Sequence, residues 1–594
     1  MLLAIALRPK SGDSEIAMAR TGRYHARVLN LNPDARLAGV LAPVFSLRGE
    51  NDLGIGDTAS LKEFISWSAS HGLKVVQILP VNETGNDHSP YNLLSAMALD
   101  PSTVATSPKH LEDLTEEDFS RITSSVDLDS LRSGPVRYGE VKVLKTDLLR
   151  AAFATFRSRK ATPRTRAFAK FERENKSWLE DYSLHRALVN FHGESEVSTH
   201  WPTEHQSPSA AREWLAALPA KDRKALKEEM RFRAYVQWIA YSQWGEARQH
   251  AEALDVALMG DVPVGVSIFS SDVWQNPGIF DLTRSSGAPP EKVFKSDPFT
   301  EKWGQNWGFP LYDWPEMAKD DFRWWRLRMR LMMSLFHLLR VDHALGFFRI
   351  YSFPWRPEEN ELFTPLTPED AAAITGGRLP GFVDHDDDTE EHREHNRRHG
   401  EMIFEMLLSE TKAHRLIAED LGEVAPYVRP SLMRMEIPGF KIPQWERTWD
   451  RLTPGAEYQR LSLATYATHD HPPLKAMWDD LVTHAASEDQ NLREAAIHSL
   501  WELMNFCGHP DIKLPQTYTP EIHGILLKGL FQSNSWLAVH MVTDIFGIDL
   551  RFNVPGSTGD QNWRERIPGE ISTWNEGWAG PLQILKEALI DTER

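Results

Sequence analysis

"LLRVDHALGFFRIYSFPW" (residues 338–355) joins an apolar run to a charged tip. The run begins before this stretch, in LMMSLFHLL, and it ends at Arg340 and Asp342. A short run rich in Leu and Val is typical of a strand that is buried on both faces, as the strands of a parallel sheet are. We therefore predict a buried parallel strand whose polar end meets solvent or a ligand.

Seven further apolar runs end in polar, Gly or Pro residues in the same way. They are AGVLAPVFSL (38–47), LKVVQILPV (73–81), DVALMGDVPVGV (255–266), HRLIAEDLG (414–422), IPGFKIPQW (437–445), SLATYATHD (462–470) and WLAVHMVTD (536–544). Helical patterns lie between several of them, for example at 58–72, 321–337 and 399–414. Strands and helices that alternate eight times predict an α/β fold, a (β/α)8 TIM barrel, with its chemistry at the carboxyl ends of the strands.

Two long insertions interrupt this alternation. Residues 101–250 are largely helical in pattern and far exceed an ordinary crossover, so we expect a helical insertion within the barrel. Residues 356–400 are expected to form a loop insertion over the active site, because long loops on this face of a barrel shape substrate access. The expected division is an N-terminal segment, 1–36, and a catalytic barrel, 37–594, with no separate C-terminal β-domain.

Composition excludes several classes of protein and of partner. The hydrophobic content of 41% excludes a disordered chain, and the net charge of −18 argues against a nucleic-acid partner. The single cysteine, Cys507, has no partner for an internal disulfide, and no apolar run is long enough to span a membrane. We expect a soluble, cytoplasmic protein of undetermined oligomeric state. The 21 tryptophans suit either a glycan groove or an ordinary large core.

Three of the predicted strands end in carboxylates: Asp342 in RVDH, Glu419 in AEDLG and Asp470 in THDH. Strand ends of a barrel converge, so these acids are expected to share one bowl. A retaining glycosidase centre needs one carboxylate as nucleophile and a second carboxyl group, with a raised pKa, as acid. Arg340 would keep Asp342 ionised. The alternative is that the acids form ion pairs between loops, or cap helices.

Other motifs follow in a fixed order along the chain. They are SPYNLLSAMALDP (89–101), GDVPVGVSIFSSDVWQNPGIF (260–280), GAPPEKVF (287–294), GQNWGFPLYDW (304–314), IPGFKIPQW (437–445) and FNVPGSTGDQNWRER (552–566). With RVDH, IAEDLG and THDH, they make the chain resemble the amylomaltases from about residue 39 to 566. These are the 4-α-glucanotransferases, or disproportionating enzymes, of the α-amylase superfamily.

The resemblance implies roles for individual residues. Asp342 would be the nucleophile, Glu419 the acid/base and Asp470 the transition-state stabiliser. Further substrate-binding positions are implied at Arg340, His469, Asp261 and His343, at Ser89, Tyr91 and Asn553 for the donor sugar, and at Gln305 and Trp307 in a loop on the acceptor side. The implied substrates are α-1,4-glucans and maltooligosaccharides, and neither a cofactor nor a metal is expected.

The chain also departs from the family pattern. Glu291 stands where the family usually has Asp, KSDPFTEKW (295–303) lengthens the following loop, and His471 replaces the usual Asn. These changes concern acceptor choice and product size. The run HDDDTEEHREHNRRHGE (385–401) is expected to be a solvated loop or lid, although His395 and His399, four residues apart, leave a metal site open.

The sequence therefore favours a retaining 4-α-glucanotransferase. An α-amylase-type glucan hydrolase on the same centre remains an alternative, and so does an inactive glycan-binding relative that kept the barrel.

Overall fold

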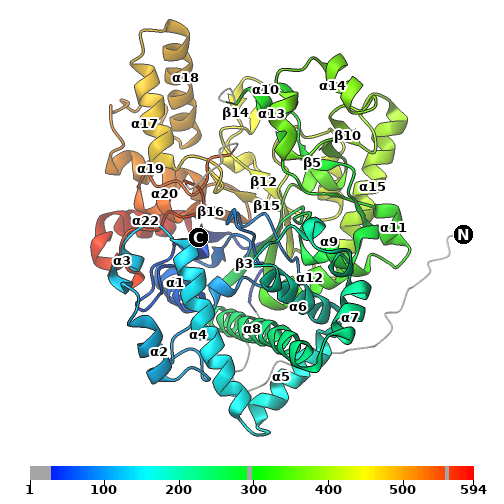
Figure 1. The fold of residues 1–594 in the computed structure, drawn as a ribbon. Helices are drawn as coiled ribbons and strands as arrows, with labels where there is room; N and C mark the ends of the chain where they lie inside the picture. The colour runs from blue at the N-terminus through cyan, green and yellow to red at the C-terminus, as the bar shows by residue number, and fades with distance from the viewer. Residues whose placement is uncertain (1–28, 291–296, 556–560) are drawn as a thin grey trace, which may run out of the picture.

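The computed structural model describes residues 29–290, 297–555 and 561–594. Its centre is a closed barrel of parallel strands (Figure 1). Around the barrel the strands follow the order β1 (Leu37–Leu41), β16 (Leu537–Met541), β15 (Ser462–Ala464), β12 (Gly439–Lys441), β11 (Leu416–Ala418), β8 (Leu338–Val341), β3 (Ala257–Val262) and β2 (Val75–Gln77). Each predicted apolar run supplies one strand, so the predicted (β/α)8 barrel is confirmed.

Strand β8 lies between β3 and β11, and all four of its residues are buried. The register places Arg340 opposite Asp261 on β3 and Ile417 on β11. Gly260 on β3 leaves room for the ring of Phe336, which lies 2.5 Å from where a Cβ would stand. Close packing on both faces explains why the strand is apolar until it reaches its charged end.

Helices cover the outside of the barrel. The predicted helices at 58–72 and 321–337 are α1 (Thr58–Ser70) and α12 (Arg323–Leu335). The helix predicted at 399–414 is α15 (Glu390–Ser409) and begins nine residues earlier than expected. The Thr389 hydroxyl caps it by accepting the His392 N–H at 3.1 Å. Much of the His-rich run is therefore helical, and the prediction of a loop there was wrong.

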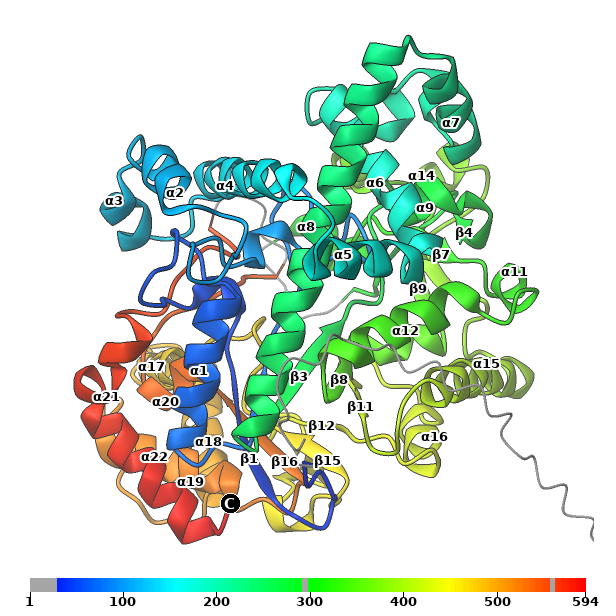
Figure 2. The same ribbon diagram turned by 90° about the horizontal axis from the view of Figure 1, so that it is seen from below.

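A group of helices occupies the chain between β2 and β3. They are α2 (Glu116–Thr123), α3 (Leu128–Ser133), α4 (Tyr138–Ser158), α5 (Pro163–Glu174), α6 (Lys176–Phe191), α7 (Pro208–Ala217) and α8 (Ala220–Ala253). Figure 2 shows α8 running from the α6–α7 group to the barrel. Its later turns pack on α1, α12 and β3, where Trp244 meets Phe336. Helix α8 thus belongs both to the added helices and to the barrel wall.

A small antiparallel sheet lies beside the barrel and joins two segments that are distant in sequence. It contains β10 (Gly381–Val383), β9 (Ile350–Phe353), β5 (Ser285–Ala288) and β6 (Gln305–Asn306), in that order. Helices α13 (Asn360–Phe363) and α14 (Pro368–Ile374) accompany it (Figure 1). The stretch 356–400 therefore contains helices and a strand as well as loops.

Two hairpins follow strands on the other side of the barrel. The α17 (Leu474–Ala485) and α18 (Gln490–Phe506) pair stands out from the body in Figure 1. The strand pair β13 (Arg447–Thr448) and β14 (Arg451–Leu452) follows β12 and contacts α18. In the described part of the chain, no helix has the length and apolar character needed to cross a membrane.

Candidate active site

Arg340 is the centre of the charged cluster at the end of β8. Its Nη1 donates to Asp261 Oδ2 at 2.5 Å and lies 3.1 Å from Asp342 Oδ1, while Nη2 lies 3.5 Å from Glu419 Oε2. Burial alone would lower the pKa of this guanidinium, but the acids around it, Asp261 first, raise the pKa well above its usual value. One permanent cation therefore holds three carboxyl groups together.

Asp342 and Glu419 face the opening of the barrel, with 18% of each side chain exposed, whereas Arg340 is 3% exposed. Backbone groups aim both carboxyls. The Val264 N–H donates to Asp342 Oδ2 at 3.3 Å, and the His343 N–H donates to Glu419 Oε2 at 2.7 Å. A ligand in the bowl can thus reach both acids, while the guanidinium remains behind them.

The environment of Glu419 favours its protonated form. Burial raises the pKa of Glu419 to about 8, because Arg340 only partly offsets it and the charge of Asp342 adds to it. At neutral pH this carboxyl group carries a proton. A protonated carboxyl beside a second acid is the arrangement that general acid catalysis requires.

Asp470, which follows β15, has the opposite environment. Burial would raise the pKa of Asp470, but His469 and Asn553 together bring it below the usual value. His469 Nε2 lies 3.2 Å from Oδ2, and Asn553 Nδ2 donates to Oδ1 at 2.6 Å. Asp470 therefore keeps its negative charge, with 37% of its side chain exposed.

Tyr91 connects the two groups of acids. Its hydroxyl donates to Asp261 Oδ2 at 2.8 Å, and its ring stacks on His469 with centroids 5.0 Å apart. Its backbone N–H donates to Ser89 Oγ at 3.3 Å. The loop after β2 is thereby fixed to the ends of β3 and β15.

Trp307 contacts the residue that follows Asp342. Its ring meets His343 edge-on at 4.8 Å, and its Nε1 donates to Gln305 Oε1 at 3.2 Å. Burial lowers the pKa of His343 to about 4, so that ring is neutral near pH 7. A continuous set of contacts therefore joins all the site residues predicted from the sequence, and their substrate contacts stay a prediction.

Some site groups were missed by the sequence reasoning. Trp563 packs against both Tyr91 and His469, at 5.9 and 5.7 Å, and Arg551 Nη2 donates to the Asp470 carbonyl at 2.8 Å. The FNVPGSTGDQNWRER motif contains Trp563 and directly follows Arg551, so it held a signal for both. The Val264 N–H is a backbone group and has no such signal. Glu291 lies outside the described residues.

The aromatic residues of the 338–355 stretch divide into buried and half-buried. Phe347 and Phe348 are buried in the main core. Trp355 stacks on Phe363 with centroids 3.8 Å apart, and Tyr351 donates its hydroxyl to the Trp303 carbonyl at 3.3 Å. Trp355, which is 4% exposed, is therefore a core residue of the small sheet.

The His-rich segment forms a cluster of its own. His385 stacks on His392 at 4.2 Å, and His395 Nε2 lies 3.3 Å from Asp384 Oδ2. Among the residues that the structure describes, no three His, Cys, Asp or Glu side chains are grouped so that they could hold a metal ion. The metal interpretation of His395 and His399 therefore gains no support.

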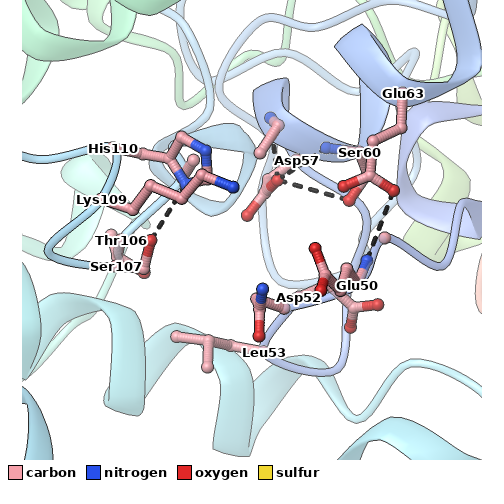
Figure 3. Close-up of a pocket in the computed structure, with 14 residues that line it drawn as sticks. Glu50, Asp52, Leu53, Asp57, Ser60, Glu63, Thr106, Ser107, Lys109 and His110 are labelled. Carbon is pink, nitrogen blue, oxygen red and sulfur yellow. Dashed lines mark hydrogen bonds between the residues drawn. The ribbon is translucent and has the colours of Figure 1, made fainter.

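A separate pocket lies between the loop after β1 and residues 105–110 (Figure 3). Several acidic side chains line it, but structural partners engage two of them. Asp57 caps α1 and pairs with the buried Lys145 at 3.3 Å, and Asp52 pairs with the buried Arg566 at 2.9 Å. These ion pairs hold the β1–α1 loop in place. None of the residues that line the pocket belongs to the Arg340 cluster.

Fold and site together define a class of protein. A (β/α)8 barrel with a protonated carboxyl group and a second acid at its strand ends is an arrangement of enzymes that act on glycosidic bonds. The family model described as 4-alpha-glucanotransferase matches residues 42–572. The chain therefore belongs to the 4-alpha-glucanotransferase family, as the sequence motifs predicted, and is an enzyme of that family.

Individual relatives are similar to this chain over most of its length. A 4-alpha-glucanotransferase of Chlamydia pneumoniae is 28% identical over 89% of this chain and 91% of its own. A 4-alpha-glucanotransferase of Thermus thermophilus is 28% identical over 90% of this chain and 96% of its own. The solved amylomaltase from Streptococcus agalactiae in complex with acarbose covers 94% of this chain and 99% of its own, with a TM-score of 0.72 and 23% identity, and shows the same fold.

Proposed function

We propose that the protein transfers α-1,4-glucan segments between maltooligosaccharides or glucans by a retaining double displacement. Family membership supports the transferase activity. The observation that supports the mechanism is the shared Arg340, which holds Asp342 beside Glu419 while the pKa of Glu419 is raised to about 8. Two acids with different protonation can act as nucleophile and acid on one glycosidic bond.

In the first step, Asp342 attacks the anomeric carbon while Glu419 gives its proton to the leaving oxygen. The glycosidic C–O bond breaks, a glycosyl ester forms on Asp342, and the leaving chain departs with a free 4-hydroxyl group. Esterification removes the negative charge of Asp342, which is one cause of the raised pKa of Glu419. The pKa of Glu419 then falls, which suits this carboxylate to accept a proton.

In the second step, an acceptor places its own 4-hydroxyl group where the leaving chain stood. Glu419 takes the proton of that hydroxyl as its oxygen attacks the anomeric carbon, and the ester bond to Asp342 breaks. Asp470, kept ionised by His469 and Asn553, is placed to hold ring hydroxyls as positive charge develops on the sugar. The enzyme returns to its first state.

The remaining predicted residues are assigned to the two sides of the cleaved bond. Arg340 and Asp261 would support the acids from behind, with His469 alongside. Ser89, Tyr91 and Asn553 would contact the donor sugar. His343, Gln305 and Trp307 are assigned to the acceptor side, where the edge-on ring contact fixes Trp307.

Transfer exceeds hydrolysis only when water is kept from the glycosyl ester until an acceptor binds. We assign this cover to the Trp307 loop and to residues 356–400, whose strand β10 joins the sheet that carries Gln305. We retain residues 1–36 as an N-terminal segment, 37–594 as the catalytic barrel and 101–250 as its helical insertion.

Incubation with maltotriose tests the proposed activity directly. We expect glucose together with a ladder of shorter and longer maltooligosaccharides, resolved by anion-exchange chromatography. The total number of reducing ends is expected to stay constant, because each transfer breaks one bond and forms another. A rise in reducing ends in step with substrate loss would show a hydrolase instead.

The raised pKa of Glu419 predicts the pH dependence. The proton that Glu419 donates is present below its pKa of about 8 and is lost as pH rises through that value. We therefore expect kcat/KM for maltotriose to fall on the alkaline side with an apparent pKa near 8. Initial rates measured across that range check this, and a limb near pH 5 to 6 with no change near 8 would contradict the assignment.

A further inference from the structure

Trp449 is an exposed aromatic side chain at the turn of the β13–β14 hairpin. It is 96% exposed, far more than any other large hydrophobic side chain of the described residues, the next being Ile590 at 65%. A protein gains nothing in stability from an indole ring left in water. A single exposed aromatic ring is common on protein surfaces, so its support and its neighbours decide whether it serves a ligand.

The hairpin that carries Trp449 is well anchored. Arg447 makes two hydrogen bonds to Glu502 of α18, at 2.6 and 3.0 Å, and Glu502 is itself 7% exposed. The Thr453 N–H donates to the Glu446 carbonyl at 2.8 Å, and the Thr448 and Thr453 hydroxyls lie 2.7 Å apart. The ring is therefore presented from a braced support, which lowers the entropy cost of stacking a ligand on it.

The backbone at Trp449 is unusual for a large residue. Its φ is +60°, in the left-handed region that turns of two residues usually fill with Gly or Asn. A tryptophan there costs conformational energy and buries no surface within the chain. Backbone strain of this kind clusters at functional sites and ligand clamps.

A second exposed tryptophan on the same segment contacts a residue beside the catalytic bowl. Trp445, four residues before Trp449, is 52% exposed, and its ring meets His471 with centroids 4.9 Å apart. His471 directly follows Asp470. Burial lowers the pKa of His471 to about 4, so a neutral ring lies between Asp470 and Trp445 near pH 7. In Figure 1 the hairpin, labelled β14, lies above β12, the strand that precedes Trp445.

We propose that Trp449 and Trp445 form a stacking platform for an α-glucan chain that extends from the catalytic bowl. The inference rests on the proposed function for its ligand class. Glucose rings present apolar C–H faces that match an exposed indole, and an uncharged glucan is not repelled by a protein of net charge −18. The platform holds long chains several sugars away from the cleaved bond.

Long and short substrates distinguish the platform from the catalytic centre. We expect Trp449→Ala to raise KM for amylose about threefold to tenfold, the scale of one lost aromatic contact. The ratio of KM for amylose to KM for maltotriose should rise by the same factor, because the proposal places the turn beyond the three sugars of maltotriose. Trp449→Phe keeps an aromatic ring and should therefore keep KM for amylose close to the wild-type value. Phe191→Ala, which removes an exposed ring on α6, is the matched control and should leave the ratio unchanged.

Binding without turnover gives a second readout. In native gels that contain soluble starch, Asp342→Asn protein should be retarded, and adding Trp449→Ala should remove most of the retardation. Equal KM ratios and equal retardation with and without Trp449 would overturn the platform. So would a change in molar mass on Trp449→Ala in light scattering, since the surface would then join two copies of the chain. Failure of the maltotriose test with retardation intact would reject the proposed function and leave the platform standing.

Discussion

The Asp342→Asn variant is expected to lose transfer activity by about 10⁴-fold or more while remaining folded. Without the carboxylate no glycosyl ester can form, and the amide that replaces it is a poor nucleophile. The fold should survive because Arg340 keeps its bond to Asp261 at 2.5 Å and its contact with Glu419 at 3.5 Å. Maltotriose turnover and a thermal unfolding curve measure the two parts of this expectation.

A matched control removes a carboxylate elsewhere. Asp591→Asn deletes a surface charge that pairs with Lys528 at 2.7 Å on the outer helices, and it should leave turnover near the wild-type value. A variant that lacks its nucleophile cannot retain more than about one hundredth of the wild-type rate. A higher residual rate for Asp342→Asn would show that Asp342 is not the nucleophile. Turnover lost together with the folded state would be a stability effect, which the unfolding curve identifies.

The Glu419→Gln variant is expected to lose activity on maltotriose by about 10²-fold to 10⁴-fold, the usual contribution of a general acid. Glutamine still accepts the His343 N–H that reaches Glu419 Oε2 at 2.7 Å, so the site geometry should persist. The alkaline limb near pH 8 should disappear with the carboxyl group that causes it. Rates on maltotriose from pH 5 to 9 check both statements.

Two donors with different leaving groups distinguish a general acid from a residue that has only a structural role. Fluoride departs without protonation, so Glu419→Gln should release fluoride from an α-maltosyl fluoride donor in the first turnover at close to the wild-type rate. The Glu587→Gln variant, on the exposed face of α22 (Ala579–Thr592), is the charge-matched control and should behave as wild type with both donors. Equal losses on maltotriose and on the fluoride would contradict the acid role.

The barrel was predictable because each of its strands is a continuous apolar run between polar residues. A strand buried on both faces leaves that pattern in the sequence, as Leu338–Val341 does. The start of α15 was not predictable from apolar spacing, because its first turns are charged and are marked only by the Thr389 cap and the acidic Glu390 and Glu391.

The sequence predicted which acids lie together at the strand ends, but it missed Trp563 and Arg551 and did not give the electrostatics. Glu419 and Asp470 both follow barrel strands, and among their sequence neighbours only His469, beside Asp470, indicates a difference in protonation. The rest of the difference arises in space, where Glu419 shares Arg340 with two other acids and Asn553 donates to Asp470. Contacts between residues far apart in the chain, such as Arg340 with Glu419, are not visible in the sequence.

The roles of the individual tryptophans could not be predicted from the sequence either. The sequence left the 21 tryptophans as either a core or a glycan surface, and the structure divides them between the core and the protein surface. Trp244, Trp325, Trp478, Trp536 and Trp574 are fully buried, whereas Trp449 is almost fully exposed. Composition could not assign these roles, because exposure depends on packing against distant elements.

The location of the covalent intermediate tests the central claim most directly. Glu419→Gln should form the glycosyl ester from α-maltosyl fluoride and discharge it slowly, because no base remains to activate an acceptor. After proteolysis, mass spectrometry should find the maltosyl group on the peptide that contains Asp342, and the Asp342→Asn/Glu419→Gln double variant should carry none. Fluoride release with no adduct, or an adduct on any residue other than Asp342, would contradict the account.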